Sequence, residues 1–362
     1  MEQKKKKKIP WSKIILIIIC LLVYVISIYL VVVPFIQTEV QDSTAKDSAK
    51  VFSENVLPSI DSYTNTMEFP ITGQSRIIKE NKTVVSEQEL IREYGEKNEL
   101  EYADLLADMI DYNKKIYEEE QENLTDAWSY TRSAFNLKDY GIEDGIVGVL
   151  EIPTMEVSFP VYLGATAENM SKGVAQLTET SMPIGGKNTN CVIAGHRGWN
   201  NGKFLKDIEV VQEGDPIILT NLWYRMEYVV SEIKLIYPND IDEILIQPGR
   251  DMLTIVTCHP YGTGGRYYRY LLICDRVRDF DVERQSLKYQ PMNNPTTEQD
   301  GIRRERIILP EVDYFSSEKD ILFDDILHYG GCIMAVVIPV IAIVLIILNK
   351  QRNKKKNKKS GA

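Results

Sequence analysis

Eight short apolar runs between residues 145 and 278 constrain the fold of this chain more than any other feature. They are rich in Val, Ile, Leu and Tyr, and turn signals such as Gly185-Gly186 and Gln247-Pro248-Gly249 separate them. Runs of this kind are typical of β-strands, and their close spacing favours a closed barrel or a sandwich. The expected strands span 146–152, 157–162, 173–177, 190–195, 216–220, 224–236, 252–258 and 268–277. The sequence therefore predicts a mainly β domain over residues 145–278.

Three of these strands carry residues that together suggest a reactive thiol. One strand ends in Cys258, another is followed by His196, and Arg269 begins the last strand. A thiol with an ordinary pKa of about 8.5 is mostly protonated at neutral pH, so a nucleophilic cysteine needs a cationic neighbour. An imidazole can also protonate a leaving amine, and a guanidinium can hold a substrate backbone or a developing oxyanion. Cys258, His196 and Arg269 are therefore the predicted catalytic residues.

Two other residues compete for these roles. His259 directly follows Cys258, where strand alternation points its side chain elsewhere, so His196 is favoured as the catalytic histidine. Arg266 remains a rival of Arg269, which is favoured because it starts a strand expected beside the Cys258 strand.

The same segments resemble the motifs of the sortase family. Residues 254–258, Thr-Ile-Val-Thr-Cys, resemble its Thr-Leu-X-Thr-Cys signature, and residues 195–198, Gly-His-Arg-Gly, resemble the segment around its catalytic histidine. Residues 258–262 and 269–272 are similar to the stretch that leads to its catalytic arginine, although the intervening loop is longer than the family pattern. The resemblance implies an eight-stranded sortase β-barrel with short helices. Thr257 is expected to contact the bound peptide through its backbone or hydroxyl.

Within the family the chain is most similar to class C, the pilin-polymerising sortases. Asp126-Ala127-Trp128 resembles the Asp-Pro-aromatic motif of the class C lid, with Ala in place of Pro, although a tripeptide can also match by chance. The resemblance implies a lid over residues 124–144, with Asp126 near Arg269 and the Trp128 ring over Cys258. Such a lid blocks substrate until it opens. Losing the proline relaxes the backbone at Asp126.

Two uncharged apolar stretches, 14–37 and 326–348, are long enough to cross a membrane as helices. A signal peptide is the alternative for the first stretch, but its apolar part is too long and no clear cleavage site follows. The basic tails 1–13 and 349–362 carry +5 and +7, which predicts that both termini are cytoplasmic and the middle lies outside. The formal net charge of −10 then leaves about −22 for that middle, which disfavours nucleic-acid binding.

Segments outside the predicted barrel and spans are polar. Residues 39–84 are expected to form a weakly structured stalk, and residues 86–123 have the apolar spacing of amphipathic helices, with a coiled coil as the alternative. Residues 279–325 are predicted to be an acidic linker. Of the five cysteines, Cys191 and Cys274 sit inside apolar runs and are expected to be buried, with a bridge between them left open.

The resemblance implies a cysteine transpeptidase at the surface of a Gram-positive bacterium. It would cleave a Leu-Pro-X-Thr-Gly-like sorting signal between Thr and Gly through a thioester and pass the acyl group to a lysine amine of a pilin subunit. It needs no cofactor or metal. The alternatives are a housekeeping-type sortase that attaches surface proteins to a cell-wall precursor, and a non-enzymatic membrane-anchored scaffold. A papain-like order is disfavoured because here the histidine precedes the cysteine.

Overall fold

The computed structural model describes residues 11–64, 100–199, 202–261 and 268–277, and scattered positions between 321 and 351. The chain divides into two compact units. One comprises Met1–Val40 and Glu318–Ala362, and the other is Gln41–Ser317, which holds all the described strands.

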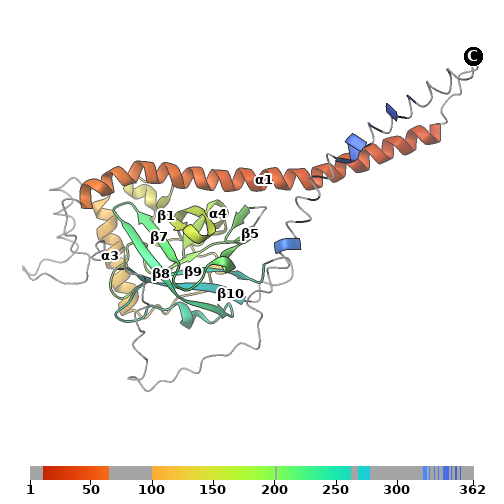
Figure 1. Ribbon diagram of the computed structural model, residues 1–362. Coiled ribbons are helices and arrows are strands. Elements are labelled where there is room, and N and C mark those ends of the chain that lie inside the picture. Colours follow the sequence, from red (N-terminus) through yellow and green to blue (C-terminus); the bar gives the residue numbers. More distant parts are fainter. Residues whose placement is uncertain are drawn as a thin grey trace, which may run out of the picture. The chain divides into compact units, whose positions relative to one another are not determined.

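Eight strands of the larger unit close into a barrel (Figure 1) with the order β1-β2-β3-β4-β9-β10-β8-β7. The strands are β1 (Ile146–Ile152), β2 (Val157–Leu163), β3 (Val174–Gln176), β4 (Thr189–Ala194), β7 (Pro216–Asn221), β8 (Arg225–Ile236), β9 (Asp251–His259) and β10 (Tyr268–Arg276). Each corresponds to one of the eight runs identified in the sequence, and the closed barrel rather than the sandwich is observed. The prediction of an eight-stranded, mainly β domain is therefore confirmed.

Short helices were expected in the barrel, but the positions of several short elements were not predicted. The hairpin of β5 (Arg197–Trp199) and β6 (Gly202–Phe204) forms a separate two-stranded sheet directly after β4. A short helix α4 (Ala167–Lys172) lies between β2 and β3. The described part of the chain also has the single 3₁₀ turns η1 (Ala127–Ser129), η2 (Leu137–Tyr140), η3 (Pro153–Met155), η4 (Ile208–Val210) and η5 (Ile241–Ile244). Elements of three to six residues are too short to show a periodic pattern in the sequence.

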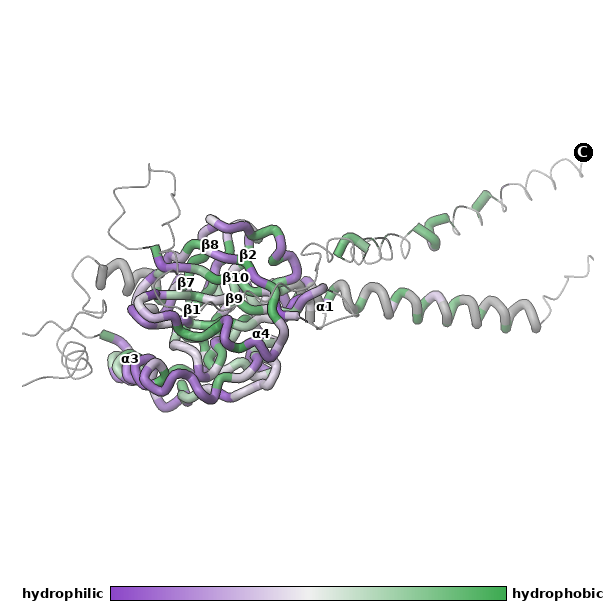
Figure 2. Tube along the Cα trace, turned by 90° about the horizontal axis from the view of Figure 1, so that it is seen from below, coloured by the Kyte–Doolittle hydropathy of each residue, from purple (hydrophilic) through white to green (hydrophobic). Residues whose placement is uncertain are grey.

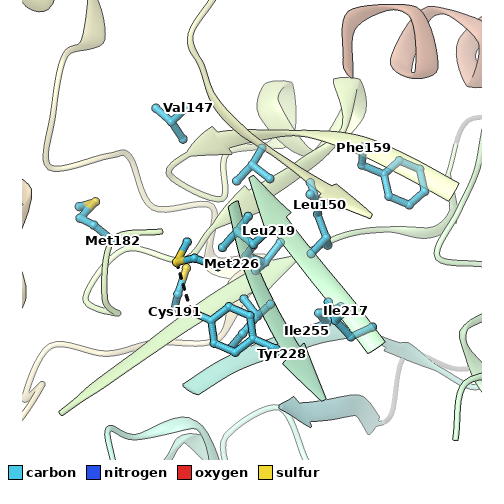
Figure 3. Close-up of a cluster of buried hydrophobic side chains, with 14 of the residues drawn as sticks. Val147, Leu150, Phe159, Met182, Cys191, Ile217, Leu219, Met226, Tyr228 and Ile255 are labelled. Atoms are coloured by element: carbon cyan, nitrogen blue, oxygen red, sulfur yellow. Dashed lines mark hydrogen bonds between the residues drawn. The ribbon is translucent and has the colours of Figure 1, made fainter. Parts of the chain in front are cut away.

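Strand alternation gives the barrel two buried faces. Side chains that point inward form one hydrophobic cluster, in which Leu150, Cys191, Leu219, Tyr228 and Ile255 converge (Figure 3). The intervening residues of the same strands point outward into a second cluster, which contains Val192, Ala194, Val256 and Leu271 and is covered by Phe52, Leu124 and Ala127. In Figure 2 the strands accordingly form the greenest, most hydrophobic part of this unit. Neither face of β4 and β9 is left to solvent.

Helix α3 (Ala103–Glu118) lies within the region for which amphipathic helices were predicted. It buries Leu105, Leu106 and Met109. Two of its polar side chains also bind the barrel: Asn113 Oδ1 accepts a 2.6 Å hydrogen bond from the Met182 amide, and the Tyr112 hydroxyl accepts one of 3.1 Å from the Glu179 amide. Residues 65–99, which hold the rest of that region, lie outside the described residues.

Helix α1 (Trp11–Thr64) corrects the prediction of a weakly structured stalk, because residues 39–64 continue the helix. Within the larger unit, Ala45, Ala49 and Phe52 are buried at successive helical turns, and Ala49 and Phe52 join the outer hydrophobic cluster. Gln41 Nε2 also donates a 2.8 Å hydrogen bond to the carbonyl of Ser171 in α4. Packing against the barrel therefore stabilises a helix that the mixed polar sequence does not predict.

None of the helices among the described residues combines the length and the apolarity that a membrane span requires. The first predicted span, 14–37, lies within helix α1, and the second, 326–348, is described only in part. Residues 278–320, with most of the predicted acidic linker, lie outside the described residues.

Candidate active site

Cys258 and Arg269 are held opposite each other by the register of β9 and β10. The two strands are antiparallel, and Cys258 pairs directly with Arg269. Directly opposed residues of such a pair have their Cβ atoms about 5 Å apart on one face of the sheet. The Arg269 Nη1 group accordingly donates a hydrogen bond of 3.9 Å to the Cys258 Sγ atom. A permanent positive charge therefore lies against the thiol.

His196 reaches the same place from the other side of β9. Strand β4 runs parallel to β9, and Ala194 is opposite Val256 at the end of the ladder. The next residue continues the contact, because the Gly195 amide donates a 3.1 Å hydrogen bond to the Val256 carbonyl. His196 is thus level with Cys258, two residues past the last pair. Because alternate residues share a face, both side chains lie on the outer face of the barrel.

The segment predicted to be a lid, residues 124–144 and called the lid segment below, contacts this face through Trp128. The centroid of its ring lies 4.3 Å from Arg269 Cζ and 6.3 Å from the centroid of the His196 ring. Cys258, His196 and Arg269 are only 7%, 3% and 6% exposed. A peptide cannot reach the thiol in this arrangement unless the segment moves.

Asp126 anchors the lid segment to the same arginine. Its Oδ1 and Oδ2 atoms accept hydrogen bonds of 2.7 Å each from Arg269 Nε and Nη2, a two-point ion pair. Asp126 also begins turn η1, where Oδ2 accepts a 3.2 Å hydrogen bond from the Trp128 amide. Asp126 therefore pairs with the Arg269 guanidinium and also fixes the position of Trp128. Ala127, between them, lines a small crevice together with Leu177, Ile236, Ile244 and Val256.

Thr257 does not face the same surface. Its side chain is fully buried, and its hydroxyl donates a 2.8 Å hydrogen bond to the Gly195 carbonyl. Strand alternation turns Thr257 away from the face that carries Cys258. The predicted hydroxyl contact with bound peptide is therefore corrected: the hydroxyl instead ties β9 to the residue before His196.

Of the two rival residues, His259 is separated from the site, whereas Arg266 is not among the described residues. His259 points into the barrel, where its Nδ1 atom is 3.0 Å from Arg197 Nη1 and 3.1 Å from Glu209 Oε1. Arg266 falls within residues 262–267, which are outside the described residues. The sequence analysis did not identify Arg197 and Glu209. Arg197 could have been found, because it directly follows His196, and strand alternation places Arg197 and His259 together on the face opposite Cys258.

Cys191 and Cys274 are free, buried thiols, so the bridge left open by the sequence is not present. Burial raises the pKa of both thiols well above the ordinary value, with a smaller contribution from Asp251 for Cys191 and from Asp275 for Cys274. Neither is suited to act as a nucleophile. Across the described ranges no group of three or more His, Cys, Asp or Glu side chains is arranged to hold a metal ion.

The Cys258 thiol, the Arg269 guanidinium and the His196 imidazole thus lie at neighbouring ends of three barrel strands. Residues 150–277 match the family model for the sortase domain, so this part of the chain is a sortase domain.

Two curated relatives show how far the similarity extends. Sortase A of Bacillus anthracis is 30% identical over 113 residues, which are 31% of this chain and 52% of that protein. Sortase D of Bacillus subtilis is 28% identical over 131 residues, which are 36% and 63% of the two chains. The chain thus spans between half and two thirds of these relatives.

Similar solved structures include two sortases named C1 or C-1. The complex of Streptococcus agalactiae sortase C1 with MTSET is 27% identical, with a TM-score of 0.44, and the match covers 49% of this chain and 90% of that one. Sortase C-1 of Actinomyces oris is 28% identical, with a TM-score of 0.43, and the match covers 49% and 99%.

Proposed function

We propose that this chain is a sortase-type cysteine transpeptidase. The observation that carries the proposal is the direct pairing of Cys258 with Arg269 at the ends of β9 and β10, with His196 level with them, inside a sortase domain. A cation beside the thiol favours the thiolate. The same guanidinium has further N–H donors for an oxyanion or a substrate carbonyl.

The reaction consists of two acyl transfers. The Cys258 thiolate attacks the threonine carbonyl of a Leu-Pro-X-Thr-Gly-like signal, the Thr–Gly C–N bond breaks, and His196 protonates the departing glycine amine. An acceptor amine then attacks the thioester carbonyl, gives its proton to the His196 imidazole and releases the Cys258 thiolate. The thioester retains the free energy of the cleaved peptide bond, so the reaction needs no cofactor or other energy source.

As the acceptor we propose the lysine side-chain amine of a pilin subunit, so that repeated cycles assemble a pilus. The contacts of the lid segment support this choice. Asp126 lies on Arg269, as the class C resemblance implies, and the Trp128 indole, expected over Cys258, lies beside Arg269 and His196. In this proposal the lid segment must open before the signal peptide binds.

The test is turnover by the purified full-length chain supplied with a sorting-signal peptide and an amine. Cys258→Ala should abolish formation of the peptide–amine product, which is detected by mass spectrometry. Cys191→Ala is the matched control and should retain turnover, because Cys191 lies in the barrel interior. Full turnover by Cys258→Ala would refute the mechanism, and an inactive wild-type chain with an unreactive Cys258 would favour the scaffold alternative.

The acceptor is tested separately with purified pilin subunits. A ladder of covalent multimers is the expected product of polymerisation. Attachment of single proteins to a cell-wall precursor amine, without a ladder, would identify the housekeeping-type alternative instead.

We also propose that the sortase domain faces the outside of the cell between two membrane anchors. This rests on the sequence: the uncharged stretches 14–37 and 326–348 are each flanked by a strongly basic tail. Single cysteines introduced into each tail should be shielded from an impermeant thiol reagent in intact cells. A cysteine in the barrel surface should react, and labelling of either tail would overturn this topology.

A further inference from the structure

The residues that directly follow the three candidate catalytic residues also meet, on the inner side, where β9, β10 and the start of β5 come together. Arg197, His259 and Tyr270 follow His196, Cys258 and Arg269 in the chain. The His259 ring stacks on the Tyr270 ring with centroids 6.0 Å apart, and Arg197 Cζ lies 5.9 Å from the Tyr270 centroid. Arg197 Nη1 is 3.0 Å from His259 Nδ1.

Glu209, in turn η4, completes this inner cluster. Its Oε1 atom is 2.6 Å from Arg197 Nη2 and 3.1 Å from His259 Nδ1. The side chains of Arg197 and His259 are each 1% exposed and that of Glu209 is 7% exposed. A buried guanidinium is tolerated only with a paired negative charge and well-placed hydrogen bonds. Glu209 supplies that negative charge and lies against both Arg197 and His259, while the hydrogen bonds of Arg197 run through its Nη1 and Nε atoms.

The position of the inner cluster along the strands indicates which strand ends it holds together. The paired register of β4 and β9 ends at Ala194 and Val256, two residues before His196 and Cys258. One residue beyond that pair of candidates, the Arg197–Glu209–His259 contacts join the end of β9 to the start of β5, which directly follows β4. Arg197 is also fixed from the other side, because its Nε donates a 3.2 Å hydrogen bond to the Lys206 carbonyl.

We propose that Glu209 is a positioning residue that, through Arg197 and His259, sets the separation between His196 and Cys258. The inference relies on the proposed function only for the identity of this reacting pair. Proton transfer and thiolate pairing depend steeply on distance, and a misplacement of about 1 Å can cost about 10²-fold in rate. Loss of the Glu209 carboxylate should therefore impair Cys258 without removing any group that touches substrate.

The test is Glu209→Gln in the full-length chain, a substitution that keeps the shape and removes the charge. Alkylation of Cys258 by iodoacetamide is followed across pH by mass spectrometry of the Cys258 peptide, alongside peptide turnover. The alkylation rate at neutral pH should fall by about tenfold or more, and the midpoint of its pH profile should move upward toward that of an ordinary thiol. In turnover, kcat should fall with KM little changed.

Asp251→Asn is the matched control for a merely structural effect. Asp251 is also a buried carboxylate of β9, at the opposite end from Cys258, and it contacts the Tyr228 hydroxyl at 3.2 Å and Arg276 at 3.8 Å. Its substitution should lower the melting temperature while leaving the alkylation profile of Cys258 at its wild-type midpoint.

Glu209→Gln leaves Arg197 buried without its counter-charge and can prevent folding. In that case Arg197→Met combined with Glu209→Gln removes both charges at similar volume and is tested in the same way. A folded variant with the wild-type alkylation profile overturns the inference. A shifted profile in a chain whose wild type turns over no sorting peptide would support the positioning role while refuting the transpeptidase.

Discussion

On the outer and inner sides of the barrel wall around β9, an arginine pairs with a carboxylate, but the two pairs differ in which segment supplies the carboxylate. On the inner face, Arg197 and Glu209 meet at 2.6 Å inside the barrel wall. On the outer face, Arg269 meets Asp126 at 2.7 Å, and Asp126 belongs to the lid segment that precedes the barrel strands. The inner pair is part of the framework, whereas the outer pair can separate without opening the barrel. Removing the two carboxylates should therefore have opposite effects on Cys258.

The cysteines are also divided between the inner and outer faces of the barrel. Cys191 and Cys274 lie in the barrel interior among apolar side chains, where burial raises the pKa of each thiol. Cys258 is on the other face, within hydrogen-bonding reach of Arg269. Three similarly buried thiols thus meet very different electrostatic environments.

The largest expected effect on the outer pair comes from Arg269. Arg269→Lys keeps the charge but loses the planar fork of N–H donors, so kcat/KM should fall by about 10²- to 10³-fold. The measurement is peptide turnover by the full-length chain. Arg266→Lys is the matched control and should remain close to wild type. Loss of activity in the Arg266 variant with retention in the Arg269 variant would assign the role to Arg266.

The comparison of thiols predicts a smaller but clear difference in reactivity. Iodoacetamide should modify Cys258 at least about 10²-fold faster than Cys191 or Cys274 at neutral pH, because each unit of pKa changes the thiolate fraction about tenfold. Mass spectrometry of the three cysteine peptides after timed labelling of the native chain measures the rates. Equal rates for the three cysteines would remove the distinction between the two faces.

Asp126→Asn should act in the opposite direction to Glu209→Gln. Weakening the Arg269 contact shifts the lid segment toward its open form, so alkylation of Cys258 should accelerate by about tenfold. Asp139→Asn is a control within the same segment, since Asp139 contacts the exposed Asn136 side chain rather than the site. A rate for Asp126→Asn below that of the wild type would show that Asp126 supports the thiol rather than blocking access to it.

The smallest expected effect concerns acid stability of the inner cluster. Burial alone raises the pKa of Glu209, but its close contact with His259 and the charge of Arg197 outweigh burial and lower that pKa below its usual value. Such a carboxyl contributes stability above its unfolded pKa of about 4.3, and the contribution is lost as pH falls through the folded pKa.

Urea unfolding of the wild type and Glu209→Gln, at neutral pH and below about pH 4, measures this contribution as a difference in unfolding free energy. The loss on acidification should be smaller in the variant. The control is Glu168→Gln, where the hydrogen bond and charge of Lys172 lower the pKa of an exposed carboxyl. It should change the acid response less, because solvent screens the pair. An identical acid response in Glu209→Gln and the wild type would contradict the framework role of this pair.

Most of the barrel was predictable because its signals are local. Strand β1 spans the predicted residues Ile146–Ile152, and β9 extends the predicted run by one residue at each end. Apolar runs between turn residues identify such strands without reference to the rest of the chain. The continuation of α1 to Thr64 was not predictable, because it depends on a barrel surface that buries Ala49 and Phe52.

For the site, the order of residues along the strands already implied that Cys258 and His259 point to opposite faces, as do His196 and Arg197. Alternation is a property of any extended chain, so it can be read from residue numbers. The tertiary structure alone decided which carboxylate meets each arginine. Asp126 is 143 positions from Arg269, and Glu209 reaches His259 from another part of the chain. Such pairs form only when barrel closure brings distant segments together and removes the water that would otherwise solvate their charges.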